Sequence, residues 1–278
     1  MSDNWIVQII ENALKIWSEK LGEIWTLLTT PLSAFRGGGI WGVIVNINGA
    51  IQAIAFALLV LFFLVGVVKT CGTFADLKRP EIAVKLFIRF IIAKVLITHG
   101  LELMMALFSV VQGVISTIMR TSGVAGSAGT SMPAGMVSTI EGLGFLESIP
   151  LWAVSLIICI VVWVLSIIVI LTVYARFFKL YIFTAIAPIP LSTFAGEPTQ
   201  SVGVSFLRSY CAVLLEGAVI ILACVIFSLF AASPPVVDSS ASAVTQVWSY
   251  FGELILNMLI LVGTVKMADR LIKEMFGM

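Results

Sequence analysis

Long apolar runs constrain the fold of this chain more than any other feature of its sequence. The clearest run extends from Leu151 to Tyr174, contains no charged residue, and has Trp152 and Tyr174 near its ends. About 20 apolar residues in a helix cross a hydrocarbon core of roughly 30 Å, and tryptophan and tyrosine are enriched at its two interfaces. Only 11% of the 278 residues are charged, whereas soluble proteins carry about 25%. The sequence therefore predicts a polytopic membrane protein.

Five apolar runs are long enough to be predicted membrane-spanning helices, which gives an all-α fold class. They lie at about 43–68, 95–118, 151–174, 206–230 and 248–265. A further apolar stretch, Leu180 to Leu191, is too short to span a bilayer, and Pro188 and Pro190 break any helix there. We expect it to form a Pro-broken interfacial or re-entrant segment on the cytoplasmic side.

A basic cluster lies between the first two predicted spans and sets their orientation. Its members are Lys69, Lys78, Arg79, Lys85, Arg89 and Lys94. Because Lys and Arg concentrate in cytoplasmic loops, this cluster is predicted to be cytoplasmic. The tail after the last span is also basic, whereas the outside holds Arg120 in its loops and Lys15, Lys20 and Arg36 in the N-terminal region. With five spans, this distribution places the C-terminus inside and the N-terminus outside.

Part of the basic cluster is predicted to lie on an amphipathic helix. Pro80 suits the first turn of a helix, and Glu81, Lys85 and Arg89 follow at intervals of four residues, on one face. A single helix from here through the second span would be roughly 55 Å long, which exceeds the hydrocarbon core. We therefore expect a division near Lys94, with the span after it. The basic side chains either reach anionic headgroups or contact a cytoplasmic partner.

Residues 1–36 are predicted to form an external amphipathic helix, ahead of a transmembrane helical domain at 37–278. In this region glutamine, glutamate and lysine recur at spacings of three and four, and the remaining positions are mostly apolar. A helix with one polar face and one broad apolar face lies in the membrane interface or packs on a partner helix. Pro31 and the glycines at 37–39 are expected to end this helix in a flexible turn.

The sequence carries no motif of an enzyme or of a self-powered transporter. It lacks a phosphate-binding GxxxxGK[ST] loop, an HExxH metal site and a GxSxG nucleophile motif. The single histidine cannot form a metal site alone, and the four cysteines lack metal or redox spacing. We therefore predict no enzyme, and no catalytic residue, metal or cofactor.

Two glutamates inside the predicted spans are the notable polar features. Glu102 and Glu216 each lie eight residues beyond a basic residue near the inner edge, so both are expected about 12 Å along their spans. A carboxylate at that depth is costly unless it is protonated, paired or facing water. His99, one turn before Glu102, is its expected partner. These acids either line a polar path or join protomers, or they hold helices together by hydrogen bonds.

The layout and two stretches of sequence resemble the TrbL-type conjugal transfer membrane proteins. The stretches are Phe63 to Ile97 (FLVGVVKTCGTFADLKRPEIAVKLFIRFIIAKVLI) and Phe178 to Gly196 (FKLYIFTAIAPIPLSTFAG). The layout is similar in its external amphipathic helix, five spans, basic first cytoplasmic loop, Gly/Ser-rich external loop and internal C-terminus. TrbL-type proteins are polytopic inner-membrane subunits of type IV secretion systems, and this chain looks most like the short versions in integrative conjugative elements of Gram-positive bacteria.

The resemblance implies a channel or scaffold subunit that helps pass relaxase-bound single-stranded DNA across the cytoplasmic membrane. It further implies a homo-oligomeric ring, for which a pentamer is a fitting size, with the system's ATPases inside and other channel subunits outside. Mapped onto this chain, the basic residues from Lys69 to Lys94 would face the ATPases or the DNA, because basic side chains contact phosphates.

Two other function classes remain open on the residues alone. A secondary transporter or small-solute channel would be expected to show internal repeats or paired broken helices, whereas Leu180 to Leu191 is the one broken segment and has no counterpart. A membrane scaffold without a pore is poorly separated from a channel subunit by sequence.

Overall fold

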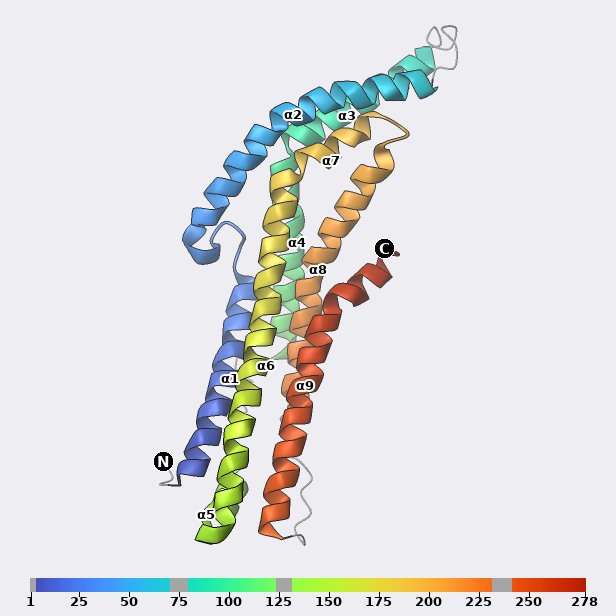
Figure 1. Cartoon of the computed structure of the whole chain (residues 1–278). Helices are drawn as coiled ribbons and strands as arrows, with labels where there is room; N and C mark the ends of the chain where they lie inside the picture. The colour runs from blue at the N-terminus through green and yellow to red at the C-terminus, as the bar shows by residue number, and fades with distance from the viewer. Residues whose placement is uncertain (1–3, 71–79, 124–131, 232–241) are drawn as a thin grey trace. The chain divides into compact units, whose positions relative to one another are not determined.

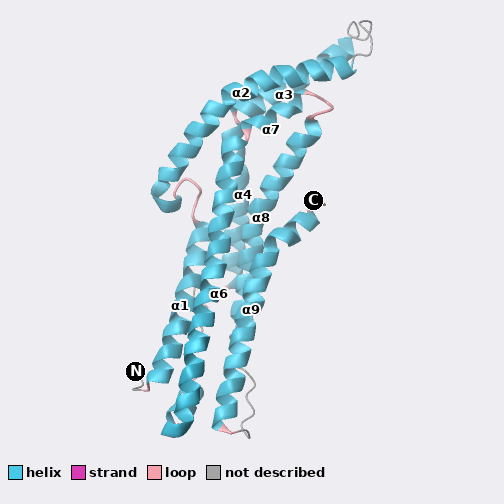
Figure 2. Ribbon diagram, in the orientation of Figure 1, coloured by secondary structure: helices cyan, strands magenta, loops and turns pink. Residues whose placement is uncertain are grey.

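Every regular element in the computed structural model is a helix within the residues it describes, which are 4–70, 80–123, 132–231 and 242–278 (Figures 1 and 2). The elements are α1 (Trp5–Thr29), η1 (Phe35–Gly38), α2 (Gly39–Thr70), α3 (Pro80–Thr98), α4 (Gly100–Ser122), α5 (Ala134–Glu141), α6 (Phe145–Ile186), α7 (Pro188–Ser192), η3 (Thr193–Ala195), α8 (Gln200–Ala231) and α9 (Ala243–Met275). Five of these helices are long and apolar enough to cross a membrane, namely α2, α4, α6, α8 and α9. This confirms the predicted fold class.

The helix after the basic cluster is divided, but at His99 rather than near Lys94. Two hydrogen bonds carry the backbone across the division: His99 N donates to Val95 O at 2.9 Å, and Leu103 N donates to His99 O at 2.9 Å. The chain bends here from α3 into α4 (Figure 1). Gly100 lies at the bend, where a Cβ would come 2.8 Å from a methyl group of Leu191. The division therefore falls where Gly100 packs closely against Leu191, and not at Lys94.

Helix α6 is much longer than the predicted span at 151–174. It continues without a break through Tyr174 and Lys179 to Ile186. Its 42 residues correspond to roughly 63 Å, about twice the hydrocarbon thickness. The expected separate segment at 180–191 is therefore corrected: its first seven residues are the end of α6, and only Pro188–Ser192 forms the short helix α7. The prolines do break the helix, as predicted.

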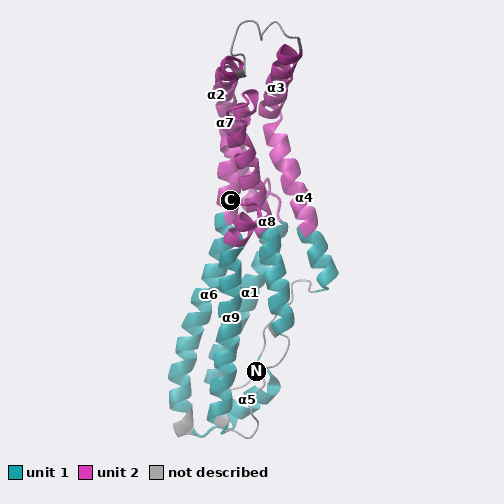
Figure 3. Cartoon of the chain, turned by 90° about the vertical axis from the view of Figure 1, so that its right-hand side faces the viewer, with its two compact units in different colours: residues 1–29, 115–175, 217–268 teal, residues 30–114, 176–216, 269–278 magenta. Residues whose placement is uncertain are grey.

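The described chain divides into two compact units, coloured separately in Figure 3. Unit 1 comprises residues 1–29, 115–175 and 217–268, and unit 2 comprises residues 30–114, 176–216 and 269–278. Helices α4, α6, α8 and α9 each contribute residues to both units. Each unit has its own buried apolar core.

In unit 1, helix α1 packs its apolar face against other helices of the same chain. The face is almost fully buried and consists of Ile6, Val7, Ile10, Ala13, Leu14, Trp17, Leu21, Ile24, Trp25 and Leu28. Trp17 lies edge-on to Phe227 of α8, with ring centroids 6.0 Å apart. Of the two placements that the amphipathic pattern allowed, packing on a partner helix is therefore the one found.

In unit 2, the short elements α7 and η3 contact both α2 and α3. Two glycines allow the closest approach: a Cβ on Gly66 would lie 3.0 Å from the Cα of Gly196. A Cβ on Gly196 would lie 2.6 Å from the carbonyl oxygen of Phe62. Backbones can approach this closely only where side chains are absent, so these glycines hold the Pro-broken segment against the α2–α3 pair.

The connection between α1 and α2 is a tight turn held on α6 within unit 2. Arg36, Gly37 and Gly38 have positive φ angles of 47°, 77° and 79°, a region that favours glycine. Phe35 stacks on Phe177 with ring centroids 4.2 Å apart. Tyr181 donates a hydrogen bond from its hydroxyl to the carbonyl oxygen of Leu32 at 2.8 Å. The glycines do make the expected turn, and buried aromatic contacts anchor it.

We predict that Gly196→Ala destabilises the protein by about 1–3 kcal/mol, because the added methyl group meets backbone that cannot move freely. The readout is the apparent Tm of the purified protein in detergent. Gly49→Ala is the matched control, since Gly49 is exposed in α2 with open space around it. The control should be neutral or stabilising by up to about 1 kcal/mol, the usual helix-propensity gain. Equal Tm values for the two variants would contradict the packing described here.

Candidate functional site

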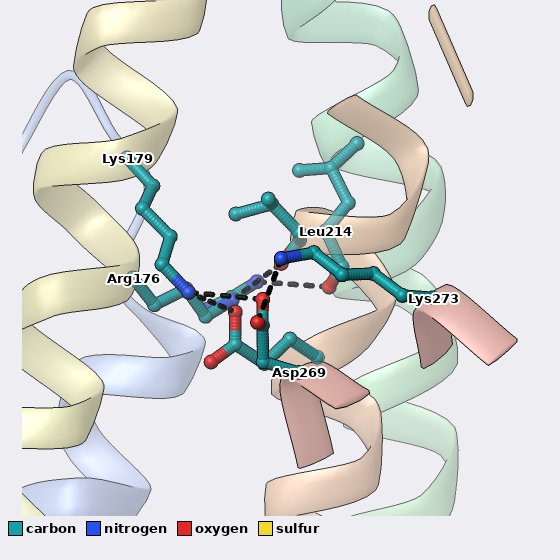
Figure 4. A network of polar contacts seen from close by, with 7 residues as sticks. Arg176, Lys179, Leu214, Asp269 and Lys273 are labelled. Carbon is teal, nitrogen blue, oxygen red and sulfur yellow. Dashed lines mark hydrogen bonds and ion pairs between the residues drawn. The ribbon is translucent and has the colours of Figure 1, made fainter. Parts of the chain in front are cut away.

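A cluster of five charged side chains joins three helices of unit 2 (Figure 4). Helix α6 contributes Arg176 and Lys179, α8 contributes Glu216, and α9 contributes Asp269 and Lys273. We call these residues the charge cluster. Three of its members are basic and two are acidic, so opposite charges nearly balance within it.

Arg176 is the most deeply buried member, with 1% of its surface exposed. Its Nε donates to the carbonyl oxygen of Val213 at 3.1 Å, and its Nη2 donates to that of Leu214 at 3.0 Å. A carbonyl within a helix retains a second lone pair, which allows it to accept these bonds. The Nη1 group has no hydrogen-bond partner among the described residues. The guanidinium therefore anchors α6 to the backbone of α8.

Lys179 links the two carboxylates of the charge cluster. Its Nζ lies 3.4 Å from Glu216 Oε2 and 3.0 Å from Asp269 Oδ1. The second oxygen of Asp269 accepts a bond from Lys273 Nζ at 2.9 Å, one turn further along α9. The Glu216 side chain is only 3% exposed, so its contact with Lys179 takes the place of contact with water.

Charges inside apolar helices are tolerated when they are paired, and removing one partner leaves the others buried without compensation. Each basic residue here donates to an acceptor on a different helix or one turn away, so the charge cluster fixes how α6, α8 and α9 pack in unit 2. Among the described residues, no group of three or more His, Cys, Asp and Glu side chains gathers as a metal would require. The contacts of the charge cluster therefore suit a structural role, in which they hold α6, α8 and α9 together.

The predicted pair is present between His99, at the bend before α4, and Glu102 in the first turn of α4. Their Nδ1 and Oε2 atoms lie 3.0 Å apart, and the Glu102 side chain is 78% exposed. The same exposed face continues at alternating spacings of four and three residues with Ala106, Ser109 and Gly113. A stripe of small and polar side chains is typical of helix-packing faces in membranes.

The two glutamates do not lie at the same level, contrary to the expectation from their spacing. The Tyr210 hydroxyl of α8 donates to the Met104 carbonyl oxygen of α4 at 2.9 Å, which aligns the two helices. The two helices run in the same direction (Figure 1), and Glu102 lies two residues before Met104 whereas Glu216 lies six residues after Tyr210. Their separation along the helices is eight residues, about 12 Å. Lys94 lies on α3, before the bend at His99, so it does not mark the start of the helix that carries Glu102.

The predicted basic contact surface is partly engaged within the chain. Arg89 Nη1 lies 3.1 Å from Glu197 Oε2, and Lys85 Nζ lies 4.0 Å from the same oxygen. These contacts hold the turn before α8 against α3. Lys69 and Lys94 are exposed. The remaining two predicted members, Lys78 and Arg79, lie outside the residues that the structure describes.

Sequence reasoning found Glu216 but not its partners. The sequence alone did not single out Arg176, Lys179, Asp269, Lys273 or Glu197 as site residues. One signal was available, because a glutamate inside an apolar run needs a basic partner. The sequence does not reveal which of the chain's lysines or arginines supplies it, since the partner lies on another helix.

We predict that Glu216→Gln destabilises the protein by about 1–3 kcal/mol, because a neutral amide replaces the buried carboxylate that pairs with Lys179. Thermal unfolding in detergent measures the effect. Glu102→Gln is the matched control and should change stability by less than about 1 kcal/mol, since its ion pair is exposed. Adding Lys179→Met to Glu216→Gln should restore part of the lost stability. A double variant less stable than Glu216→Gln alone would argue against the pairing.

Comparison with known proteins identifies the family. Residues 18–188 match the family model described as TrbL/VirB6 plasmid conjugal transfer like protein. The match covers more than half of the 278 residues and runs from within α1 to the start of α7. No curated protein and no solved structure shows significant similarity to the chain. The family match confirms the resemblance seen in the sequence: the chain belongs to the TrbL/VirB6 plasmid conjugal transfer-like family.

Proposed function

We propose that this multi-pass membrane protein is a channel or scaffold subunit of a conjugative type IV secretion system. In this role it helps pass relaxase-bound single-stranded DNA across the cytoplasmic membrane. The family match over residues 18–188 is the observation that carries the proposal. The five helices long enough to cross a membrane support it, since a conduit through a bilayer must be built from such elements.

Within this function, the two intramembrane glutamates take different roles. Glu216 is buried and paired with Lys179, which favours the helix-holding role over a pore-lining one. Glu102 is exposed beside His99 on the small and polar face of α4. We assign that face to contact with a neighbouring copy or with the polar path. A homo-oligomer, such as a pentameric ring, would bring several copies of it together.

The basic residues of α2 and α3 supply the contact with cytoplasmic partners in this proposal. Exposed Lys69 and Lys94 are available to the system's ATPases or to incoming DNA, whose phosphates attract basic side chains. Lys85 and Arg89 have the additional task of holding Glu197. This surface would face the cytoplasm, with the C-terminus on the same side and the N-terminus outside.

Deleting the gene in frame from a donor cell is expected to reduce conjugation below detection, because the channel then lacks a subunit. Conjugation frequency is the measurement, and complementation with the wild-type gene should restore it. Complementation with Glu102→Gln tests the exposed face of α4 in the same assay. Unchanged transfer in the deletion strain would overturn the proposal. Uptake assays would then test a secondary transporter or small-solute channel.

If DNA passes along this subunit, formaldehyde treatment of mating donors should cross-link the transferred strand to it. Immunoprecipitation followed by quantitative amplification of the transferred plasmid measures the capture. A plasmid lacking its origin of transfer is the control, since it is present in the donor but never enters the channel. Equal recovery of the two plasmids would reduce the role to that of a scaffold that DNA does not contact.

A further inference from the structure

Unit 1 exposes one polar surface and one apolar surface, and these two surfaces require different surroundings, water for the first and lipid for the second. The exposed face of α1 is polar and includes Gln8, Glu11, Asn12, Lys15 and Glu19. The exposed face of α6 in the same unit is apolar. Its most exposed large side chains there are Ile157, Ile160 and Leu171.

Contacts at both ends show that α1 runs alongside the apolar part of α6. Trp5 packs on Trp152 with ring centroids 5.4 Å apart. The Tyr174 hydroxyl donates to Glu23 Oε1 at 3.2 Å. These pairs are separated by 18 residues of α1 and 22 residues of α6, or about 27 and 33 Å of helix. The polar face of α1 therefore extends along a part of α6 that is about as long as the hydrocarbon core is thick.

Lipid cannot be the solvent of this polar face. A charged side chain near the bilayer centre costs about 2.5–3.5 kcal/mol by insertion scales, and such residues face the bundle interior or a water-filled cavity. Lys15 lies near the middle of the stretch between the two contacts, and its pairing with Glu19 at 4.0 Å is exposed. Glutamate is too short to reach the interface from the middle of the span. Ile157 and Ile160, each 62% exposed, suit lipid instead.

A placement of α1 flat on the membrane surface does not fit its buried face. In such a placement Trp17, Leu21 and Ile24 would contact headgroups and acyl chains. They are instead between 0% and 3% exposed, inside unit 1. One side of helix α1 is therefore buried against the other helices of unit 1, and its other side is polar and exposed.

We propose that the polar face of α1 lines an aqueous path that runs across the membrane, while the apolar face of α6 contacts lipid. This inference rests on the proposed function only in placing unit 1 in the bilayer, and it identifies which helix forms the wall. Glu11, Lys15 and Glu19 supply two acidic groups and one basic group. A wall of this kind is hydrated and nearly neutral. It lacks a cluster of basic groups that would bind the phosphates of DNA tightly, so it would not retain a strand that passes along it.

Cysteine reactivity in membranes of donor cells with the full set of transfer genes tests the proposal. The native cysteines are first replaced by alanine: Cys71, Cys159, Cys211 and Cys224. Single cysteines at Glu11, Lys15 and Glu19 are expected to react rapidly with a charged, membrane-impermeant methanethiosulfonate. The matched controls at Ile157 and Ile160 should not react. A mass shift with a polyethylene glycol maleimide reports the thiols that remain.

A cross-linking arm tests whether α1 lies at membrane depth. The pair Trp5→Cys and Trp152→Cys should be joined by a short, flexible bis-maleimide in the same membranes, because the two side chains they replace are in contact. The pair Trp5→Cys and Leu171→Cys should not, because Leu171 lies about 28 Å further along α6. Where a variant is not stably produced, cysteine at Gln8 or Asn12 on the same face replaces it.

Three outcomes would overturn the inference. Unreactive cysteines on α1 would mean that lipid or a neighbouring protein covers its polar face. Reactive cysteines without the Trp5–Trp152 cross-link would place α1 in water outside the membrane. Equal reactivity of the cysteines on α1 and α6 would mean that both faces contact water, and that unit 1 does not lie in the bilayer. None of these readouts requires DNA transfer, so the conjugation result stands or falls separately.

Discussion

Pairing of charge between apolar helices is the interaction on which the packing of unit 2 depends. Arg176 donates to two carbonyl oxygens of α8, and Lys179 bridges carboxylates of α8 and α9. Apolar side chains meeting in a bilayer gain little from the hydrophobic effect, because lipid is as apolar as they are. Directional contacts between buried polar groups therefore decide which helices meet and at what level. Tyr210 and Asn48, which donate to carbonyl oxygens of other helices, act in the same way.

Close backbone approach is the second means by which unit 2 is held together. The short segment after α6 is wedged between α2 and α3, and Gly66 and Gly196 permit that contact. The prolines prevent α6 from continuing, and the glycines let the chain that follows turn back against its neighbours. Glu197, next to Gly196, then forms its ion pair with Arg89. A local break in the sequence thus becomes a fixed part of the fold.

The candidate site could be predicted only where its contacts are local. The pairing of His99 with Glu102 follows from a spacing of one helical turn, and the structure contains it. Glu216 is conspicuous in an apolar run, but its partner Lys179 lies 37 positions earlier on α6, and Asp269, which shares that lysine, lies 53 positions later on α9. No periodicity encodes such a contact. The same limit explains Glu197, whose partners on α3 are more than 100 residues away.

By itself, the sequence determined the all-α class, the number of helices able to span a membrane, the amphipathic character of the first helix and the family resemblance. All of these follow from short-range patterns of apolar and polar residues, or from motifs contiguous in the chain. Tertiary structure alone decided that α6 runs to Ile186, that the bend falls at His99, and that α1 packs along α6 with its polar face exposed. It also decided which charges pair. These features depend on which surfaces of distant segments fit together, and that choice lies in the packing of side chains across helices rather than in the order of residues along any one of them.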